Sequence, residues 1–275
     1  MRDGRGGSPT AVLWETGLTD AERRQVPRLA GTSHAVFVSA QDDRGDEPRA
    51  SLRFFTSTGE LPACGHGTVA ALAFLAEDAE SEEYGVTLSA GGRSFAGEAR
   101  RTAEHTLATF DPGEVRLRPA TTQERDLVLH AFGPDPEIVA SEICVASIGR
   151  SRLLGPVADP SALARLSPDY DLLRDGCDGL GLLGCYVHSV PTTEGRLAAR
   201  MFAPSIGVRE DIANANSTAC LAAKLAGRGV TRITVDMGDA LGQPASILAT
   251  TEPLQSDLRI RVGGAAAVDR TGSRP

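Results

Sequence analysis

The stretch Glu60-Leu-Pro-Ala-Cys-Gly-His-Gly-Thr68 stands between the segment Arg53-Phe-Phe55 and an alanine-rich apolar run that begins at Val69. The same order returns later as Arg200-Met-Phe202, then Glu210-Asp-Ile-Ala-Asn-Ala-Asn-Ser-Thr218, then a second alanine-rich run. In each copy a short strand leads through a polar loop into the start of an apolar helix. The repeat predicts two similar structural units in one chain.

The composition is typical of an ordinary globular protein. The chain has 275 residues, of which 41% are hydrophobic and 23% charged, and its net charge is -8. An acidic chain is a poor partner for nucleic acids or anionic membranes. No apolar run approaches the roughly 18 residues of a membrane span, and residues 1–9 lack the apolar core of a signal peptide. We therefore expect a cytoplasmic protein with a small-molecule partner.

Short strands dominate the chain, and each half contains one alanine-rich helix. Residue patterns predict strands at 11–14, 34–38, 53–55, 84–88, 93–96, 106–110 and 114–117, and again at 142–147, 152–156, 184–189, 196–202, 231–237, 246–250 and 258–262. Helices are expected at 19–29, at 68–77, from about 122, and at 160–166, 169–174 and 217–225. Helix 68–77 is apolar on every side, so it should be buried. The sequence predicts an α+β fold in which a β-rich unit around a central helix occurs twice.

The first polar loop offers a candidate binding site. Gly65 and Gly67 permit a tight turn and close approach of a ligand. The backbone N–H groups of residues 67–69 should lack partners at the helix start and suit a substrate carboxylate. His66 stands beside that position and can move a proton near neutral pH. Cys64 and Thr68 complete the expected binding residues, although a histidine that only packs against the helix remains the alternative.

The second polar loop offers a complementary set of groups. Asn214, Asn216, Ser217 and Thr218 are good hydrogen-bonding residues at a helix start, so we expect them to contact the substrate. Asp211 could act as an acid or base that faces His66 across a cleft. Alternatively, it only favours the positive end of the helix dipole.

No pattern indicates a metal or a nucleotide. The five cysteines are scattered without a CxxC pair, and no His-x-x-x-His or clustered acidic spacing occurs. Gly179-Leu-Gly-Leu-Leu-Gly184 matches a GxGxxG motif, but a strand-like run follows it where dinucleotide binding requires a helix. We therefore interpret it as a glycine-rich turn and expect no metal.

Further motifs show a resemblance to a known family. They are Gly6-Gly-Ser-Pro-Thr-Ala-Val12, the two repeat copies, Ser147-Ile-Gly-Arg-Ser-Arg-Leu-Leu154, Gly207-Val-Arg-Glu-Asp211 and Gly238-Asp-Ala-Leu-Gly-Gln-Pro-Ala-Ser246. Together they resemble the PhzF-like isomerases, named for phenazine biosynthesis, within the diaminopimelate-epimerase superfamily. The resemblance implies two similar domains, each a barrel-like mixed β-sheet wrapped around a central helix. The first would comprise residues 1–118 with about 260–275, and the second residues 119–259. It also implies a substrate cleft between them, no cofactor and a homodimer.

The resemblance also assigns roles, with two departures. His66 matches the cleft histidine of the family and Asp211 its aspartate. After Ser33, however, the family usually has a catalytic glutamate, and this chain has His34. The family's second loop usually reads Thr-Gly-Ser-Ala, and this chain has Asn214-Ala-Asn-Ser.

We therefore expect a cofactor-independent isomerase that shifts a proton and a double bond in a small unsaturated amino or carboxylic acid, with His34 and His66 as proton shuttles. The resemblance points to specialised metabolism, such as alkylproline-type antibiotics. An amino-acid racemase or epimerase is one alternative, but Asn214 stands where the second thiol of a two-cysteine racemase would be. A non-catalytic small-molecule-binding protein is the other.

Overall fold

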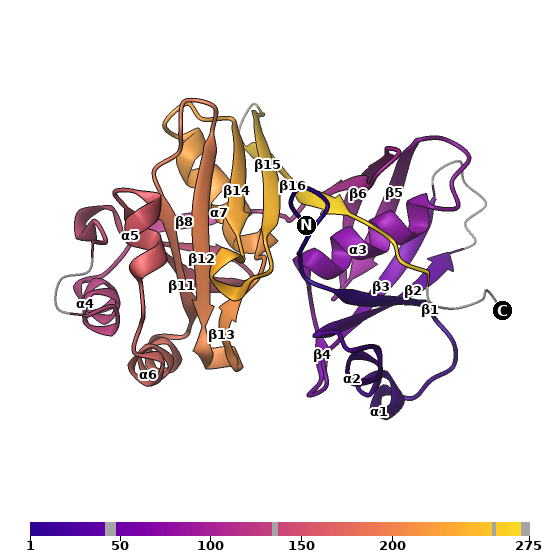
Figure 1. Cartoon of the computed structure of the whole chain (residues 1–275), viewed down its shortest axis with the longest axis horizontal. Helices are drawn as coiled ribbons and strands as arrows, with labels where there is room; N and C mark the ends of the chain where they lie inside the picture. The colour runs from indigo at the N-terminus through magenta and orange to yellow at the C-terminus, as the bar shows by residue number, and fades with distance from the viewer. Residues whose placement is uncertain (42–47, 134–136, 255–256, 271–275) are drawn as a thin grey trace. The chain divides into compact units, whose positions relative to one another are not determined.

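The computed structural model in Figure 1 describes residues 1–41, 48–133, 137–254 and 257–270. The chain forms two compact units. The first contains Met1–Asp111 with Gly263–Pro275, and the second contains Pro112–Val262. The sequence placed these boundaries after residues 118 and 259. The first boundary lies earlier because the strand at Arg116–Pro119 pairs with Cys144–Ile148 of the second unit.

The first unit is a mixed sheet around one helix. Its elements are β1 (Thr10–Trp14), α1 (Asp20–Arg23), α2 (Val26–Ala30), β2 (His34–Gln41), β3 (Arg49–Phe55), β4 (Glu60–Leu61), α3 (Gly65–Ala76), β5 (Glu83–Ala90), β6 (Arg93–Arg101) and β7 (Thr106–Phe110). The strand order is β1-β2-β3-β5-β6-β7, and β4 pairs with β3. The pairs β1–β2 and β3–β5 are parallel, and the other neighbours are antiparallel.

Helix α3 forms the centre of this unit. It contacts β1, β2, β3, β6 and β7, and Figure 1 shows it inside the curve of the strands. Ala71, Leu72, Ala73 and Ala76 are fully buried along it. A side chain at Gly97 on β6 would begin 2.6 Å from Leu72, so glycine lets this strand approach the helix. The apolar character on all sides of the helix therefore matches its surroundings.

The second unit repeats this plan with additional helices. Its elements are β8 (Arg116–Pro119), α4 (Thr122–Ala131), η1 (Ala140–Glu142), β9 (Cys144–Ile148), β10 (Arg150–Val157), α5 (Pro160–Arg165), α6 (Tyr170–Leu180), β11 (Leu182–Ser189), β12 (Arg196–Ala203), η2 (Pro204–Ile206), β13 (Val208–Asp211), α7 (Ala215–Ala226), β14 (Arg232–Met237), η3 (Asp239–Leu241) and β15 (Ala245–Pro253). The strand order is β15-β14-β12-β11-β10-β9-β8, and β13 pairs with β12. Strand β16 (Leu258–Ala266) contains the boundary between the units.

Two helical layers belong to the second sheet. Helix α7 contacts β8, β9, β14 and β15, and it is the counterpart of α3. Helices α4, α5 and α6 contribute to a separate core that includes Leu127, Leu173 and Phe202. A side chain at Gly176 would begin 2.2 Å from Leu127, so this glycine allows α6 to pack closely on α4. The predicted α+β fold, with two barrel-like sheets each wrapped around a helix, is confirmed.

Several element boundaries differ from the sequence-based expectations. The helix expected at 19–29 is two helices, because Pro27 has no N–H to continue the hydrogen bonding of α1 and instead lies in the first turn of α2. Helix α6 is longer than predicted and ends where Gly181 takes a left-handed conformation. Gly184 lies in strand β11, so a strand follows the GxGxxG match as predicted, but the match begins in the last turn of α6 with Gly181 as its C-cap rather than in a glycine-rich turn. Among the described residues, no helix has the length and apolar character needed to cross a membrane.

Candidate active site

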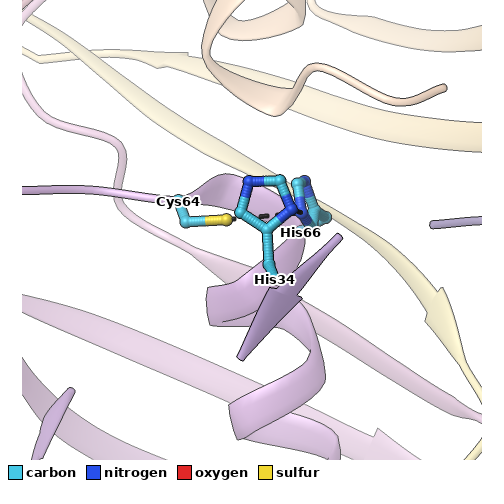
Figure 2. Close-up of side chains that lie close together, drawn as sticks. All are labelled: His34, Cys64 and His66. Carbon is cyan, nitrogen blue, oxygen red and sulfur yellow. Dashed lines mark hydrogen bonds between the residues drawn. The ribbon is translucent and has the colours of Figure 1, made fainter. Parts of the chain in front are cut away.

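Three side chains of the first unit meet at the N-terminus of α3. His66 Nε2 lies 3.0 Å from His34 Nδ1 and 3.4 Å from Cys64 Sγ. The two imidazole rings meet edge to face, with centroids 4.4 Å apart (Figure 2). Cys64 is buried, and both histidines are partly exposed. The structure therefore brings together three of the predicted site residues, although His34 comes 30 positions before Cys64 and 32 before His66.

Regular elements hold these three residues in place. His34 is the first residue of β2, where it pairs with Thr10 of β1. Cys64 is the N-cap of α3, and His66 is the second residue of that helix. The Ser33 hydroxyl lies 2.8 Å from His34 Nδ1, the same nitrogen that faces His66. Backbone pairing on one side and helix geometry on the other thus fix the distance between the imidazoles.

Gly67 supports the cluster by packing. It is buried, and a side chain there would begin 3.0 Å from both Phe54 and Val36 and 3.1 Å from Cys64 Sγ. The sequence predicted Gly67 as a substrate contact, whereas its Cα faces the protein interior. Its missing side chain therefore leaves room for the thiol, and a direct substrate contact stays a prediction.

The N-terminus of α3 offers free hydrogen-bond donors. The helix begins at Gly65, earlier than expected, so the first three N–H groups belong to residues 65–67 rather than 67–69. In the described part of the chain, no group accepts a hydrogen bond from these three. The Cys64 side chain does not cap them. Such donors, at the positive end of a helix dipole, suit a carboxylate.

The electrostatic environment keeps His66 neutral. Desolvation lowers the pKa of its imidazole to about 4, well below the ordinary value of 6.5. At neutral pH the ring therefore carries one proton and one free lone pair. An imidazole in this state can accept a proton on one nitrogen while its other nitrogen donates, as a general base requires.

The second loop is organised differently. The Asn214 amide donates to Asp211 Oδ2 at 2.9 Å, and the Asn214 carbonyl oxygen Oδ1 accepts from the Ser217 N–H at 2.9 Å. Asn214 is therefore a true N-cap for α7, and Asp211 orients it. Asp211 belongs to the second unit and His66 to the first, so their expected approach across a cleft stays a prediction. Asn216 is partly exposed.

The predicted hydroxyl contacts have structural partners. The Thr68 hydroxyl donates to the Cys64 carbonyl at 2.9 Å, and the Thr218 hydroxyl donates to the Asn214 carbonyl at 3.0 Å, so each threonine closes the first turn of its helix. Thr218 also meets the Tyr186 hydroxyl at 2.9 Å. Both threonines are buried. Substrate binding through these hydroxyls stays a prediction.

Ser217 is buried as well. Its hydroxyl accepts a hydrogen bond from the Arg152 guanidinium, which is itself 1% exposed. This contact ties the first turn of α7 to β10.

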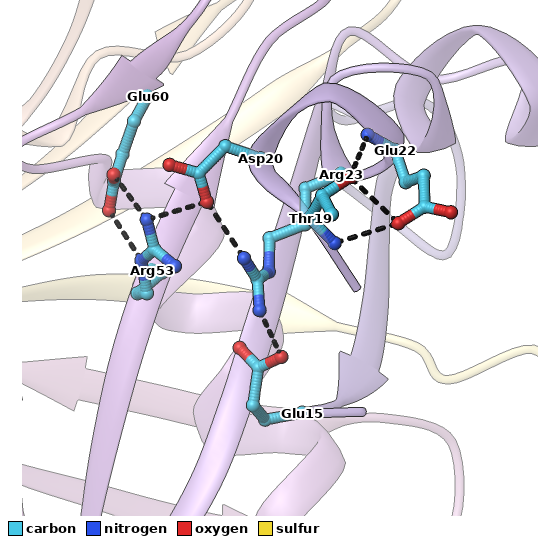
Figure 3. Close-up of polar contacts among 7 residues, drawn as sticks. All are labelled: Glu15, Thr19, Asp20, Glu22, Arg23, Arg53 and Glu60. Carbon is cyan, nitrogen blue, oxygen red and sulfur yellow. Dashed lines mark hydrogen bonds and ion pairs between the residues drawn. The ribbon is translucent and has the colours of Figure 1, made fainter. Parts of the chain in front are cut away.

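Sequence reasoning missed one feature that both units share. Arg53 binds Glu60 with two hydrogen bonds, at 2.8 and 2.6 Å, and its guanidinium lies 5.0 Å from the Phe55 ring centroid. Figure 3 shows this pair within a network that includes Asp20 and Arg23. The signal was present, because an Arg-x-Phe segment precedes a glutamate in both copies of the repeat.

In the second unit, Arg200 binds Glu210 with two bonds of 2.8 Å and lies 4.8 Å from the Phe202 ring centroid. Each pair links a long strand to the short strand that precedes a central helix, β3 to β4 and β12 to β13. We infer that the pairs hold these two short strands, and with them the starts of α3 and α7, in position.

Similarity to known proteins identifies the family of this chain. Residues 3–272 match the sequence model of the PhzC-PhzF family, described as phenazine biosynthesis-like protein. The chain belongs to this family. Its relatives include an uncharacterized isomerase of Clostridium acetobutylicum, 26% identical over 277 residues, which cover 95% of this chain and 91% of that protein. They also include the trans-2,3-dihydro-3-hydroxyanthranilate isomerase of Pseudomonas fluorescens, 27% identical over 267 residues, which cover 94% of this chain and 90% of that protein.

A solved structure supports the fold of this family member. The phenazine biosynthesis protein of the PhzF family from Bacillus anthracis superposes with a TM-score of 0.81 at 18% identity, covering 98% of this chain and 94% of that chain. The family match and the isomerases among the relatives show that the protein is an isomerase.

Proposed function

We propose that this isomerase moves a proton within a small unsaturated amino or carboxylic acid, and that His34 and His66 carry the proton. The observation that supports the proposal is the 3.0 Å contact between their nitrogens beside the free N–H groups of α3. One imidazole accepts a proton from an activated carbon, and the pair returns it to another carbon of the conjugated system. A well-placed general base of this kind contributes about 10²- to 10⁴-fold to a rate.

The N–H groups of residues 65–67 supply a place for the substrate carboxylate next to His66. Bound there, a carboxylate would hold its neighbouring carbon atoms within reach of the imidazoles. Asp211 would act from the second unit as an orienting or acidic group. No cofactor is needed for this chemistry, because histidine supplies both the acid and the base.

A difference from the family supports the substrate class that we propose. The relative from Pseudomonas fluorescens is named for trans-2,3-dihydro-3-hydroxyanthranilate. This chain has His34 where the family usually has glutamate, so we propose a different substrate, such as a cyclic imine or enamine acid in alkylproline-type antibiotic biosynthesis. We also propose that the protein acts as a homodimer, which light scattering on the purified chain would test.

Racemisation by two thiols has less support. Such a mechanism needs one base on each face of the carbon. Cys64 could supply one of these bases. The corresponding N-cap of α7 is Asn214, which has no thiol, and Cys220 is fully buried within that helix. Burial also raises the pKa of the Cys220 thiol to about 11, which disfavours the reactive thiolate.

Deuterium incorporation from D₂O into cyclic enamine acids, followed by mass spectrometry, tests the proposal. We expect exchange by the natural protein and a loss of at least about 100-fold in His34→Ala and His66→Ala. His105→Ala, a change of the same type elsewhere in the first unit, should exchange at the natural rate. Exchange that survives in both active-site variants would contradict the proposed roles. Unchanged binding without any exchange would indicate a binding protein.

A further inference from the structure

We propose that His34, Cys64 and His66 form a binding site for a thiophilic divalent transition-metal ion of the Zn²⁺ class, and that a metal bound there blocks proton transfer. The binding site stands on the structure alone, whereas its inhibitory effect rests on the proposed function. The sequence predicted no metal, because His34 comes 30 residues before Cys64 and no short ligand spacing marks the set.

The distances between the donor atoms suit a tetrahedral ion. Bonds of about 2.0 Å to nitrogen and about 2.3 Å to sulfur, at tetrahedral angles, separate two nitrogens by about 3.3 Å and nitrogen from sulfur by about 3.5 Å. The observed separations are 3.0 Å between His66 Nε2 and His34 Nδ1, and 3.4 Å between His66 Nε2 and Cys64 Sγ. All three donor atoms lie within 4.8 Å of one another. Small rotations of side chains would bring them to bonding geometry.

The chemistry of the donors selects the kind of metal. Two imidazoles and one thiolate are ligands that Zn²⁺ and its neighbours in the first transition row prefer. Mg²⁺ and Ca²⁺ require oxygen ligands, and among the described residues no carboxylate belongs to this cluster. The site should therefore discriminate strongly against the hard cations.

Burial and scaffolding favour the site further. Cys64 is buried while His34 and His66 are partly exposed, so an ion can reach the site and keep a fourth position for water. His34 lies at the start of a paired strand, and the other two ligands lie in the first turn of one helix. Gly67 leaves the space that the sulfur occupies. Little rearrangement is thus needed before the metal binds.

The ion would take the lone pairs that proton transfer requires. The facing atoms are His34 Nδ1 and His66 Nε2, the same nitrogens that the proposed reaction uses. A metal on both leaves neither free to accept a proton from the substrate. Removing the metal should restore the reaction.

Titration of chelator-treated protein with Co²⁺ tests the site, because Co²⁺ replaces Zn²⁺ and its bond to sulfur gives a charge-transfer band. We expect one equivalent to bind with that band, Zn²⁺ to displace it, and Mg²⁺ in large excess to leave it unchanged. Cys64→Ser should lose the band, and His34→Ala should weaken binding by at least about tenfold. Cys144→Ser, which removes a partly buried thiol of the second unit, serves as the control and should keep the band.

Different results would overturn the metal site and the inhibition of proton transfer. Natural protein without a sulfur–Co²⁺ band, or a band that Cys144→Ser removes and Cys64→Ser keeps, overturns the site. Deuterium exchange that continues at its full rate with one bound equivalent of Zn²⁺ overturns the inhibition. A Co²⁺ band in protein that shows no exchange even after chelation supports the metal site and contradicts the proposed proton transfer.

Discussion

The two Arg–Glu pairs have similar hydrogen-bond geometry but differ in burial, so they allow the effect of burial on an ion pair to be measured within one protein. The side chains of Arg53 and Glu60 are 37% and 41% exposed, whereas those of Arg200 and Glu210 are 12% and 6% exposed. We predict that Glu210→Gln destabilises the protein much more than Glu60→Gln. Both changes keep the shape of the side chain and remove its charge.

The expected magnitudes follow from this difference in burial. An exposed ion pair contributes about 0.5 kcal/mol, and Arg53 would still pair with Asp20 at 3.0 Å after the change. Losing the partner of a buried guanidinium costs about 3 kcal/mol, because the charge stays desolvated. Arg200 would keep bonds to the carbonyls of Leu163 and Leu166, but neither oxygen carries a full charge.

Urea unfolding measures the two free energies. Far-UV circular dichroism follows both units, and the fluorescence of the single tryptophan, Trp14, reports on the first unit, so each transition can be assigned. Equal destabilisation by the two variants, or a larger effect of Glu60→Gln, would refute the reasoning from burial.

Three further predictions concern packing and pH. Gly67→Ala should destabilise the first unit by about 1–3 kcal/mol and displace the Cys64 thiol, because the new carbon would begin 3.0 to 3.1 Å from its neighbours. Gly59→Ala is the control, because open space surrounds Gly59, and it should change the unfolding free energy little. Similar losses of stability in the two variants would count against the close packing around Gly67. The rate of solvent exchange should persist below pH 6 and fall only as the pH approaches 4. Desolvation lowers the pKa of His66 to about 4, and the imidazole must be neutral to act as the base. A midpoint near pH 6.5 in the rate profile would contradict a neutral His66 at that pH. The Arg118 guanidinium holds the pKa of the Glu124 carboxyl at about 2, against 4.5 when unperturbed. Its contribution to stability is therefore present above pH 4.5 and lost as the pH falls toward 2, so Glu124→Gln should flatten the acid side of a stability profile measured by urea unfolding.

The sequence predicted both central helices, and it predicted the burial of the first because a helix that is apolar on all sides belongs in a core. It placed the start of α3 three residues late, because Gly65 and Gly67 are more typical of a turn than of a helix. The reason for Gly67 is tertiary: the side chains of Phe54, Val36 and Cys64 fill the space around it. Packing partners so distant in sequence leave no local signal.

The site residues illustrate a second limit. Thr68 and Thr218 have the residue type and the position of ligand contacts, and the same type and position serve to close the first turn of a helix. The sequence alone does not distinguish the two uses. The contact between His34 and His66 likewise depends on how β2 lies beside α3, and the resemblance to the PhzF-like family, rather than spacing, pointed to it.

The two copies of the repeat differ at the helix cap, where Cys64 in the first corresponds to Asn214 in the second. The Asn214 side chain caps α7 by accepting a hydrogen bond from the Ser217 N–H. That N–H group is therefore not available to bind an anion. Cys64 provides no such bond, so all three leading N–H groups of α3 stay available beside two histidines and a thiol. Because these backbone donors lie beside two imidazoles and a thiol, we expect the first unit to supply the reacting groups. In the second unit, Asp211 already accepts a hydrogen bond from the cap residue Asn214, which favours the orienting role proposed for it over the acidic one.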